Sequence, residues 1–511
     1  MSRLFRCASP MVLTLALSPS WALAELTAAD VWNDWKSYMS SFGYTMDGNE
    51  SLNGGVLTVT EVAMTLPMAP EAEMGDARIE IPEMVFTENA DGTVNVTLPP
   101  VMQMTVKGQP EGGEPVDMAL AYEQSGFDMV VAGAPNDLTY TYAADEFRIS
   151  FDRLNVDGAD LIAAAGNFEV VMTGVDGVST MKVGELRDYS QTVNANEMSF
   201  VFDFKDPEGS DGSFKMNGGL QGLIFTGGGL LPLQGNAADM SALLSSGVVF
   251  EGGFEFATGA NEIAFDGPEG AGAVNTSSDG GTVQIGMSSD GLFYDVTQRG
   301  SIVSMVLPDV PLPISYSTGE TRGLISMPIQ KSDDEQDFRV LLNLDDFEMA
   351  DALWGLFDAT GQLPRDPADL VVDLNGKAKL LFDLFDPEQA AALEQSGAVP
   401  GELNSLTVNQ LLLDIVGARL TGDGAFTFDN ADLATFGGVP RPEGSLNLQL
   451  VGGNGLIDKL VGMGLLPEEQ ASGARMMLGL FAVPGEGEDT LTSTLEINDQ
   501  GHVLANGQRI Q

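Results

Sequence analysis

The sequence predicts a β-dominated α+β fold, in which large twisted antiparallel sheets form a meander with a groove and a few short helices cover them. Apolar and polar residues alternate with a period of two along much of the chain, which is typical of strands with one buried face. Asp-Gly pairs, which favour the positive φ angles of tight hairpins, separate several of these stretches. Helical spacing is confined to short segments, so we expect the helices to cover sheets.

The first 24 residues have the composition of a secretory signal peptide. Arg3 and Arg6 precede an apolar centre at residues 11–17, and Ala22-Leu23-Ala24 offers small residues for cleavage. The apolar centre is shorter than the roughly 20 residues that a membrane span requires. We therefore expect cleavage after Ala24, a periplasmic location, and no membrane-spanning segment in the mature chain.

The chain is very acidic and is expected to lose its one cysteine, Cys7, with the signal peptide. A cysteine-free mature chain excludes disulfides, thiolate metal sites and a cysteine nucleophile. The formal net charge of the 511 residues is −51, and removal of Arg3 and Arg6 changes it to −53. Nucleic acids and anionic membrane surfaces are bound through clustered Lys and Arg, so both are poor partners for this chain.

Residues 25–44, ELTAADVWNDWKSYMSSFGY, predict one short amphipathic helix. Thr27 is placed as the N-cap, with Asp30 three residues later, and Gly43 ends the helix. One face is apolar: Ala28, Val31, Trp32, Trp35, Met39 and Phe42. The other face carries Asp30, Asp34 and Lys36. We expect the tryptophans to cover a sheet, because helices in a membrane interface are usually rich in Lys and Arg.

Six stretches between residues 54 and 205 alternate regularly enough to predict strands. Their apolar positions are Ile79 and Ile81; Val94, Val96 and Leu98; Leu138, Tyr140 and Tyr142; Phe147, Ile149 and Phe151; Phe168, Val170 and Met172; and Met198, Phe200, Phe202 and Phe204. Turns are expected at Asp91-Gly92, Asp157-Gly158, Asp176-Gly177 and Asp211-Gly212. Together these signals predict an antiparallel meander.

The glycine-rich segment at residues 226–236 predicts a boundary. It separates an N-terminal β-rich half, residues 25–235, from a C-terminal β-rich half with interleaved short helices, residues 236–511. In the second half we expect a hairpin at Asp290-Gly291, and residues 307–314 are too rich in proline for anything but an edge or a connector. A Gly-x-apolar-Pro stop at Gly361, Gly397 and Gly464 ends three helical stretches.

Residues 452–481 are nearly as apolar as a membrane span. Asp458, Lys459 and Arg475 interrupt the segment, and Pro467 divides it. We therefore predict two short helices that cover the terminal sheet.

No motif commits the chain to a reaction. The only histidine, His502, is expected in an exposed terminal hairpin, so a histidine triad or zinc cluster cannot be assembled. The acids are densest in three groups: Asp345 with Asp346, Asp366 with Asp369, and Asp383 with Asp386. Helix caps and solvated turns explain these groups better than a hydrolytic acid pair. We expect a non-enzymatic protein without cofactor or metal site, with an acid-pair hydrolase as a remote alternative.

Several features of the second half resemble a known family. They are the segment PISYSTGETRGLISMPIQ with Met327-Pro328, the pair Leu353-Trp354, the run from Leu363 to Ala368, the strand at residues 372–376, and the tail segments at 441–470 and 497–508. These features resemble the Gram-negative envelope family called domain of unknown function 2125, over most of the mature chain. The resemblance implies an envelope location, and because the family has no established activity, no catalytic residue is carried over from it. More distantly, the strand and hairpin pattern is similar to AsmA-like envelope proteins, whose β-sheets form an apolar groove for lipids.

The sequence thus predicts a periplasmic protein that buries an apolar, lipid-like component along a sheet concavity. The candidate lining residues are Trp32, Trp35, Phe200, Phe202, Phe204 and Trp354. The alternative is a ligand-free envelope scaffold whose sheet edges pair with partner proteins. Expected partners are a lipid or another envelope protein, and the oligomeric state is left open.

Overall fold

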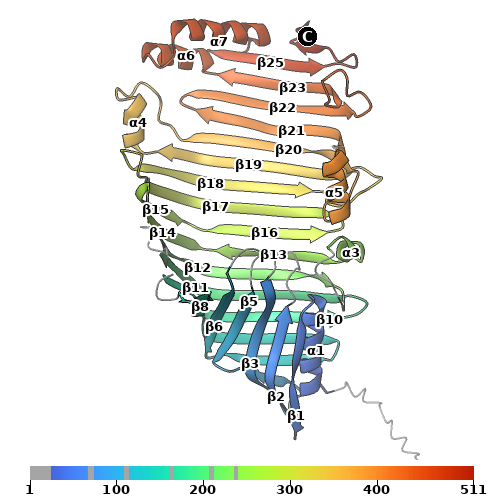
Figure 1. Cartoon of the computed structure of the whole chain (residues 1–511). Helices are drawn as coiled ribbons and strands as arrows, with labels where there is room; N and C mark the ends of the chain where they lie inside the picture. The colour runs from blue at the N-terminus through green and yellow to red at the C-terminus, as the bar shows by residue number, and fades with distance from the viewer. Residues whose placement is uncertain are drawn as a thin grey trace, which may run out of the picture.

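The computed structural model describes residues 25–66, 74–108, 114–157, 159–161, 166–205, 212–234, 240–396 and 399–511. The expected signal peptide lies outside these ranges, as do the predicted turn residues Gly158 and Asp211 and the predicted helix stop at Gly397. Within them, one 27-stranded antiparallel sheet extends from one end of the molecule to the other (Figure 1). The predicted β-dominated fold is confirmed. In the described part of the chain, no helix is long and apolar enough to cross a membrane.

The N-terminal part of the sheet contains the strands β1 to β12. Their bounds are β1 (Thr45–Asn53), β2 (Val56–Leu66), β3 (Met74–Glu88), β4 (Val94–Thr97), β5 (Val101–Gly108), β6 (Val116–Ser125), β7 (Asp128–Ala134), β8 (Asp137–Val156), β9 (Ala159–Asp160), β10 (Gly166–Val183), β11 (Arg187–Lys205) and β12 (Ser213–Leu231). The six predicted stretches lie in strands, except that β4 ends at Thr97, one residue before Leu98, and the turn at Asp91-Gly92 joins β3 to β4.

The C-terminal part continues the same sheet. Its strands are β13 (Val249–Phe256), β14 (Thr258–Gly267), β15 (Gly270–Ser278), β16 (Gly281–Ser288), β17 (Gly291–Val306), β18 (Ile314–Met327), β19 (Gln336–Met349), β20 (Ala368–Leu380), β21 (Gly401–Ile415), β22 (Ala418–Asp429), β23 (Arg441–Val451), β24 (Val483–Pro484), β25 (Thr490–Ile497), β26 (Val503–Ala505) and β27 (Gln508–Arg509). The Asp290-Gly291 hairpin and the connector at 307–314 are confirmed. Strands β12 and β13 pair across the predicted boundary, and the division into two halves stays a prediction about folding units.

The sheet branches twice in the same way. Between the long strands β3 and β8, the pair β4–β7 fills one half of the gap and the pair β5–β6 the other. Between β12 and β17, the pairs β13–β16 and β14–β15 repeat this arrangement. In both cases the first short strand pairs with the C-terminal end of the preceding long strand. The repeat is one of topology, and no spacing in the sequence predicted it.

A line of interrupted pairing, here called the crease, crosses the long strands. Its members are Asp145, Gly174, Asn196, Gly222, Gly300, Gly319 and Asp346. Gly174, Gly222 and Gly300 have φ angles of 59°, 63° and 56°. At the crease the alternation shifts by one residue, so that Ala144 and Phe147 of the same strand contact one cluster. The two stretches predicted around residues 140 and 149 are therefore a single strand, β8.

The predicted turn at Asp176-Gly177 is wrong. Both residues lie inside β10, which is paired on both sides with β8 and β11. The positive φ angle in this region belongs to Gly174, which lets the strand cross the crease without reversing its direction.

Replacing Gly174 with alanine is expected to lower the free energy of unfolding by about 1–3 kcal/mol. A Cβ atom there would lie 2.0 Å from the side-chain nitrogen Nδ2 of Asn196, on a backbone with φ 59°. Gly323 is the matched control, because a Cβ at that strand position meets no heavy atom within 4 Å. Chemical unfolding followed by circular dichroism would measure both, and equal effects of the two substitutions would contradict the strain at the crease.

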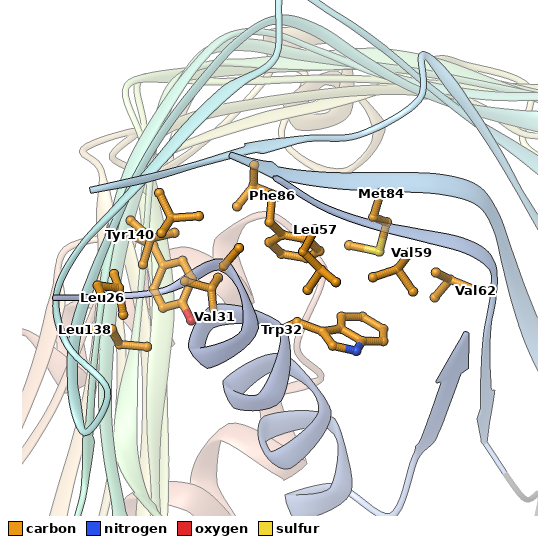
Figure 2. Packing of buried hydrophobic residues seen from close by; sticks show 14 of the residues in the cluster. Leu26, Val31, Trp32, Leu57, Val59, Val62, Met84, Phe86, Leu138 and Tyr140 are labelled. Carbon is orange, nitrogen blue, oxygen red and sulfur yellow. The ribbon is translucent and has the colours of Figure 1, made fainter. Parts of the chain in front are cut away.

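The helix α1 (Ala28–Ser41) is enclosed by the N-terminal end of the sheet. Thr27 and Asp30 form the predicted capping box. Trp32 is 1% exposed and packs against Phe86, as does Trp35, so the prediction that the tryptophans cover a sheet is confirmed. The sheet arches around the helix in Figure 2 and contributes Leu57, Val59, Val62, Met84, Phe86, Val94, Val96, Val131, Leu138 and Tyr140. These residues and the apolar face of α1 form one hydrophobic cluster, here called the α1 cluster, which closes one end of the sheet.

The sequence placed Asp34 on the polar face of α1, and this is wrong. Its carboxylate is buried, accepts a hydrogen bond from Arg187 at 2.5 Å and another from the Tyr140 hydroxyl at 2.6 Å. The side chains of Asp34 and Arg187 are 4% and 1% exposed. Arg187 also donates to Ser37 at 3.0 Å. Helical spacing could not reveal this ion pair, because its partner lies on β11, far along the chain.

We expect the α1 cluster to lose stability between about pH 10 and pH 12. Burial, and then the neighbouring Tyr189, raises the pKa of Tyr38 to about 12, and burial followed by Asp34 raises that of Tyr140. A raised pKa contributes stability that is complete below the unfolded value, near 10, and is lost as the pH rises through the folded value. Tryptophan fluorescence would follow the transition.

Tyr38→Phe should move this alkaline transition to higher pH, whereas replacement of the exposed Tyr294 by phenylalanine should leave it in place. A transition complete below pH 9 would contradict the assignment to these tyrosines.

The remaining helices leave the middle of the sheet uncovered. α3 (Met240–Ser245), α4 (Asp351–Phe357) and α5 (Pro387–Ser396) lie at the ends of strands, and α6 (Gly453–Gly462) and α7 (Glu468–Phe481) lie at the C-terminal end of the sheet (Figure 1). The predicted division of residues 452–481 into two helices is confirmed, with Gly464 at φ 73° after α6. The expectation that both cover the sheet is wrong: α7 packs against α6, and Met476 remains 72% exposed.

Candidate ligand surface on the inner face of the sheet

The face of the sheet that packs against α1 is here called the inner face. On β8 and β10 it is marked by Leu138 and Met181, which lie opposite each other and belong to the α1 cluster. Directly opposed residues of paired strands share a face, and so do residues two apart on one strand. The pairing register therefore identifies the inner-face residues on every later strand.

Three neighbouring rows of the inner face form an apolar lane. The first row is Val193, Phe225, Phe254, Val283, Val296, Gly323, Leu342, Val372, Leu411, Gly422 and Leu448. The second is Ile285, Tyr294, Ile325, Val340, Leu374, Val408, Gly424, Leu446 and Leu495. The third is Leu344, Leu370, Leu413, Leu420, Leu450 and Leu491. No member of the lane is charged.

The lane is long and open. It crosses β11 to β13, β16 to β23, and β25, and at about 4.8 Å between neighbouring strands it is about 50 Å long. None of its residues is fully buried, and Ile285, Ile325 and Leu342 are 52%, 45% and 45% exposed. A continuous exposed apolar surface of this size is typical of an interaction site.

The opposite, outer face of the same strands carries ion pairs among apolar residues such as Leu324 and Leu341. Arg322 donates to both carboxylate oxygens of Asp295, at 2.6 and 3.0 Å, and Arg339 pairs with Asp373 at 3.1 Å. These residues lie in rows that alternate with the lane, so the charged side chains of these ion pairs lie on the face opposite to it.

The six predicted lining residues fall into two groups. Phe200, Phe202 and Phe204 lie on the inner face of β11, beyond the crease from the lane. They form an aromatic cluster with Phe168 and Phe151, in which the ring centroids of Phe168 and Phe202 are 5.2 Å apart. On β11, Ala195 and Met198 of a second hydrophobic cluster lie between the lane residue Val193 and these phenylalanines.

The three tryptophans lie elsewhere. Trp32 and Trp35 belong to the α1 cluster, where the indole of Trp32 donates to Glu50 at 2.6 Å. Trp354 packs at a strand end, with its ring 5.2 Å from Phe357 and beneath the guanidinium of Arg365. The structure brings these three tryptophans neither to the lane nor to the phenylalanine cluster.

Most lane residues could not be predicted, because alternation within one strand does not show which strand is its neighbour. Stretches such as residues 340–344 and 370–374 show the apolar alternation, but neither stretch indicates which strand it pairs with or in which register. The apolar alternation changes phase by one residue between Ala144 and Phe147, and this local change in the sequence indicates the crease.

A hollow of about 720 Å³ lies over β11 to β13 and β16 to β18, and its lining includes Ile285 of the lane. Its lining includes one complete outer-face row: Ser190, Gly228, Glu251, Gly286, Phe293 and Ser326. The hollow exists because Gly228 and Gly286 have no side chains. Its lining brings no convergent acid–base or nucleophilic set together, so the lane is the better candidate surface.

Three acids meet where the crease reaches β19 and β20. Carboxylate oxygens of Asp345, Asp346 and Asp369 all lie within 4.8 Å of one another. Burial, followed by the charges of Asp346 and Asp369, raises the pKa of Asp345. The sequence assigned these acids to caps or turns, which is wrong, because all three lie within strands that continue past the crease. Asp345 and Asp346 are exposed, and their proximity alone does not define a metal site.

Two further predictions concern Asp386 and His502. Asp386 accepts hydrogen bonds from the backbone of Glu388 and Gln389, as a cap at the start of α5. His502 lies in the turn between β25 and β26, as predicted, and its backbone donates to Asn498, but its side chain is half-buried rather than exposed.

Residues 313–508 match a family model described as an uncharacterized protein conserved in bacteria, DUF2125. The resemblance predicted from the second half of the sequence is confirmed over this range, which contains β18 to β25 and most of the lane. It covers less of the chain than the sequence suggested. No curated protein and no solved structure matches the chain. The likeness to AsmA-like proteins stays a prediction.

Proposed function

We propose that this chain is a non-enzymatic periplasmic protein that binds the acyl chains of a lipid-like component along the lane. The observation that carries this proposal is the uncharged, uncovered lane across twelve strands. Burial of about 300 Å² of apolar surface would contribute about 7 kcal/mol, before the entropy cost of ordering the ligand. The periplasmic location is supported by the signal-like composition of residues 1–24.

A protein partner or a second copy of the chain is the competing occupant. Two apolar sheet faces can pack directly on each other, at a spacing of about 10 Å. Pairing at a sheet edge has less support, because the edge strand β1 carries Asp47 and Glu50, and charged residues oppose edge-to-edge pairing.

The test is native mass spectrometry of the mature chain, expressed with its own signal and purified without detergent from the periplasmic fraction. Organic extraction of the same sample would identify what is bound. We expect the mass of one chain plus one or more lipids. A lipid-free monomer across repeated gentle preparations would overturn the proposal, and so would a lipid-free dimer, which would point to packing of two inner faces.

A further inference from the structure

The helix pair α6–α7 is attached to the C-terminal end of the lane. α6 begins directly beside the lane, since a Cβ atom at Gly453 would lie 2.6 Å from the side chain of Leu450, a member of the third row. Ser493 is opposed to the lane residue Leu448, and its hydroxyl donates a hydrogen bond to the carbonyl oxygen of Phe481 at 2.5 Å. The two helices are thus held against the last strands that the lane crosses, and α7 lies beyond β25 at this end (Figure 1).

α7 presents an apolar face to solvent, here called the α7 face and made of Met476, Met477 and Leu480. These side chains are 72%, 49% and 52% exposed, and their helical spacing places them on one side of α7. Met476 is the most exposed large apolar side chain of the described ranges. Leu465 before the helix and Val483 after it are also exposed. α1 buries its apolar side chains in the α1 cluster, whereas α7 leaves this face free for a partner.

The charges of the helix pair favour a partner surface without net charge. Residues 453–485 contain two cations, Lys459 and Arg475, against three acids, Asp458, Glu468 and Glu469. Arg475 is the only charged residue between 470 and 485, and it pairs with Asp458. This composition offers no basic cluster to the phosphates of an anionic membrane. Methionine and leucine side chains enter a bilayer by apolar burial alone.

The opposite end of the lane is closed. The lane begins on β11, and α1 is fixed to the same strand: Arg187 pairs with Asp34, and the ring centroids of Tyr38 and Tyr189 are 6.2 Å apart. An acyl chain that leaves a bilayer through water exposes its whole apolar surface, which opposes the transfer. The C-terminal end is therefore the end at which a bilayer and the lane can meet.

We propose that the α7 face docks on a zwitterionic phospholipid bilayer and brings the C-terminal end of the lane to the membrane, an inference that rests on the proposed lipid binding. Apolar burial drives this docking, so high salt does not weaken it. Transfer of two of the three side chains out of water strengthens binding to the bilayer by about a hundredfold.

The test is flotation of the full mature chain with phosphatidylcholine vesicles that contain a fluorescently labelled diacylglycerol. Met476→Glu/Leu480→Glu should weaken vesicle binding by about a hundredfold and slow the removal of diacylglycerol from the vesicles. Binding of a soluble short-chain diacylglycerol should stay unchanged, because the lane is intact. The matched control is Leu52→Glu/Leu356→Glu, which adds the same charges on β1 and α4, at positions that are each 64% exposed. Circular dichroism would check the folding of both variants.

The lane variant Ile325→Glu/Leu342→Glu should still bind the vesicles but remove no diacylglycerol from them. Absence of vesicle binding by the unmodified chain, or equal effects of the α7 variant and its control, would overturn the docking role of the α7 face. A dimer that the α7 variant converts to a monomer, without vesicle binding, would assign this face to a second copy of the chain instead. Vesicle binding that is lost at about 1 M salt would point to charge and overturn apolar docking. Failure of the unmodified chain to bind the soluble diacylglycerol would overturn the proposed function itself.

Discussion

Replacing Asp34 with alanine is expected to lower the free energy of unfolding of the N-terminal part of the sheet by about 3–5 kcal/mol. The substitution leaves the guanidinium of Arg187 buried without its anion, and it removes the acceptor of the Tyr140 hydroxyl. The Nε atom of Arg187 already has no hydrogen-bond partner among the described residues, so little around it can compensate. Asp34 also ties α1 to two strands, and its loss should loosen the helix from the sheet.

Denaturant unfolding followed by the fluorescence of Trp32 and Trp35 would measure this loss. Asp351→Ala is the control: it breaks the ion pair with Arg365, in which Asp351 is 90% exposed, and should cost about 1 kcal/mol or less. The double variant Asp34→Leu/Arg187→Met should recover much of the stability, because no unpaired charge stays buried. A loss for Asp34→Ala no larger than that of the control would contradict the structural role of this ion pair.

Placing two carboxylates in the middle of the lane is expected to weaken acyl-chain binding by about a hundredfold or more. The variant is Ile325→Glu/Leu342→Glu, on two neighbouring strands. Each carboxylate that loses water against an acyl chain costs about 1–3 kcal/mol, and the two costs act on the same ligand. Both positions are exposed in the free protein, so the fold should be little affected.

The matched control is Ser326→Glu/Asn343→Glu, which adds the same charges one residue further along the same strands, on the outer face. Titration with a fluorescently labelled diacylglycerol would measure both variants, with circular dichroism as the check of folding. Equal loss of affinity in the two variants would show that charge as such, rather than the inner face, governs binding. Unchanged affinity in the first variant would remove the lane from the proposed function.

The local features of this chain could be read from its sequence, and the pairings between distant segments could not. Thr27 and Asp30 predict the start of α1, and Asp290-Gly291 predicts a hairpin. Both predictions depend on residues that lie within a few positions of each other in the sequence. The crease is intermediate between local and long-range features. Its positive φ angles are a local property of glycine, but a side chain at Gly174 would clash only because Asn196 lies opposite it. The ion pair of Asp34 with Arg187 depends on how the sheet curls, which no short stretch of residues encodes.

The candidate surface shows the same limit. Phe200, Phe202 and Phe204 were found because they alternate within one strand. The lane depends on register between strands, and a shift by one residue in any pair would have turned its leucines to the outer face.

From β17 to β23, each strand of the described sheet contacts mainly the strand before it and the strand after it. Such a structure behaves like a linear array in which neighbours stabilise one another, so opening should begin at an end and spread strand by strand. α1 secures the N-terminal end, whereas the C-terminal end has only short strands and an exposed helix pair. Insertion or deletion of one hairpin would change the lane by about 10 Å without disturbing the rest. The number of hairpins would then set the length of the ligand that the lane can hold.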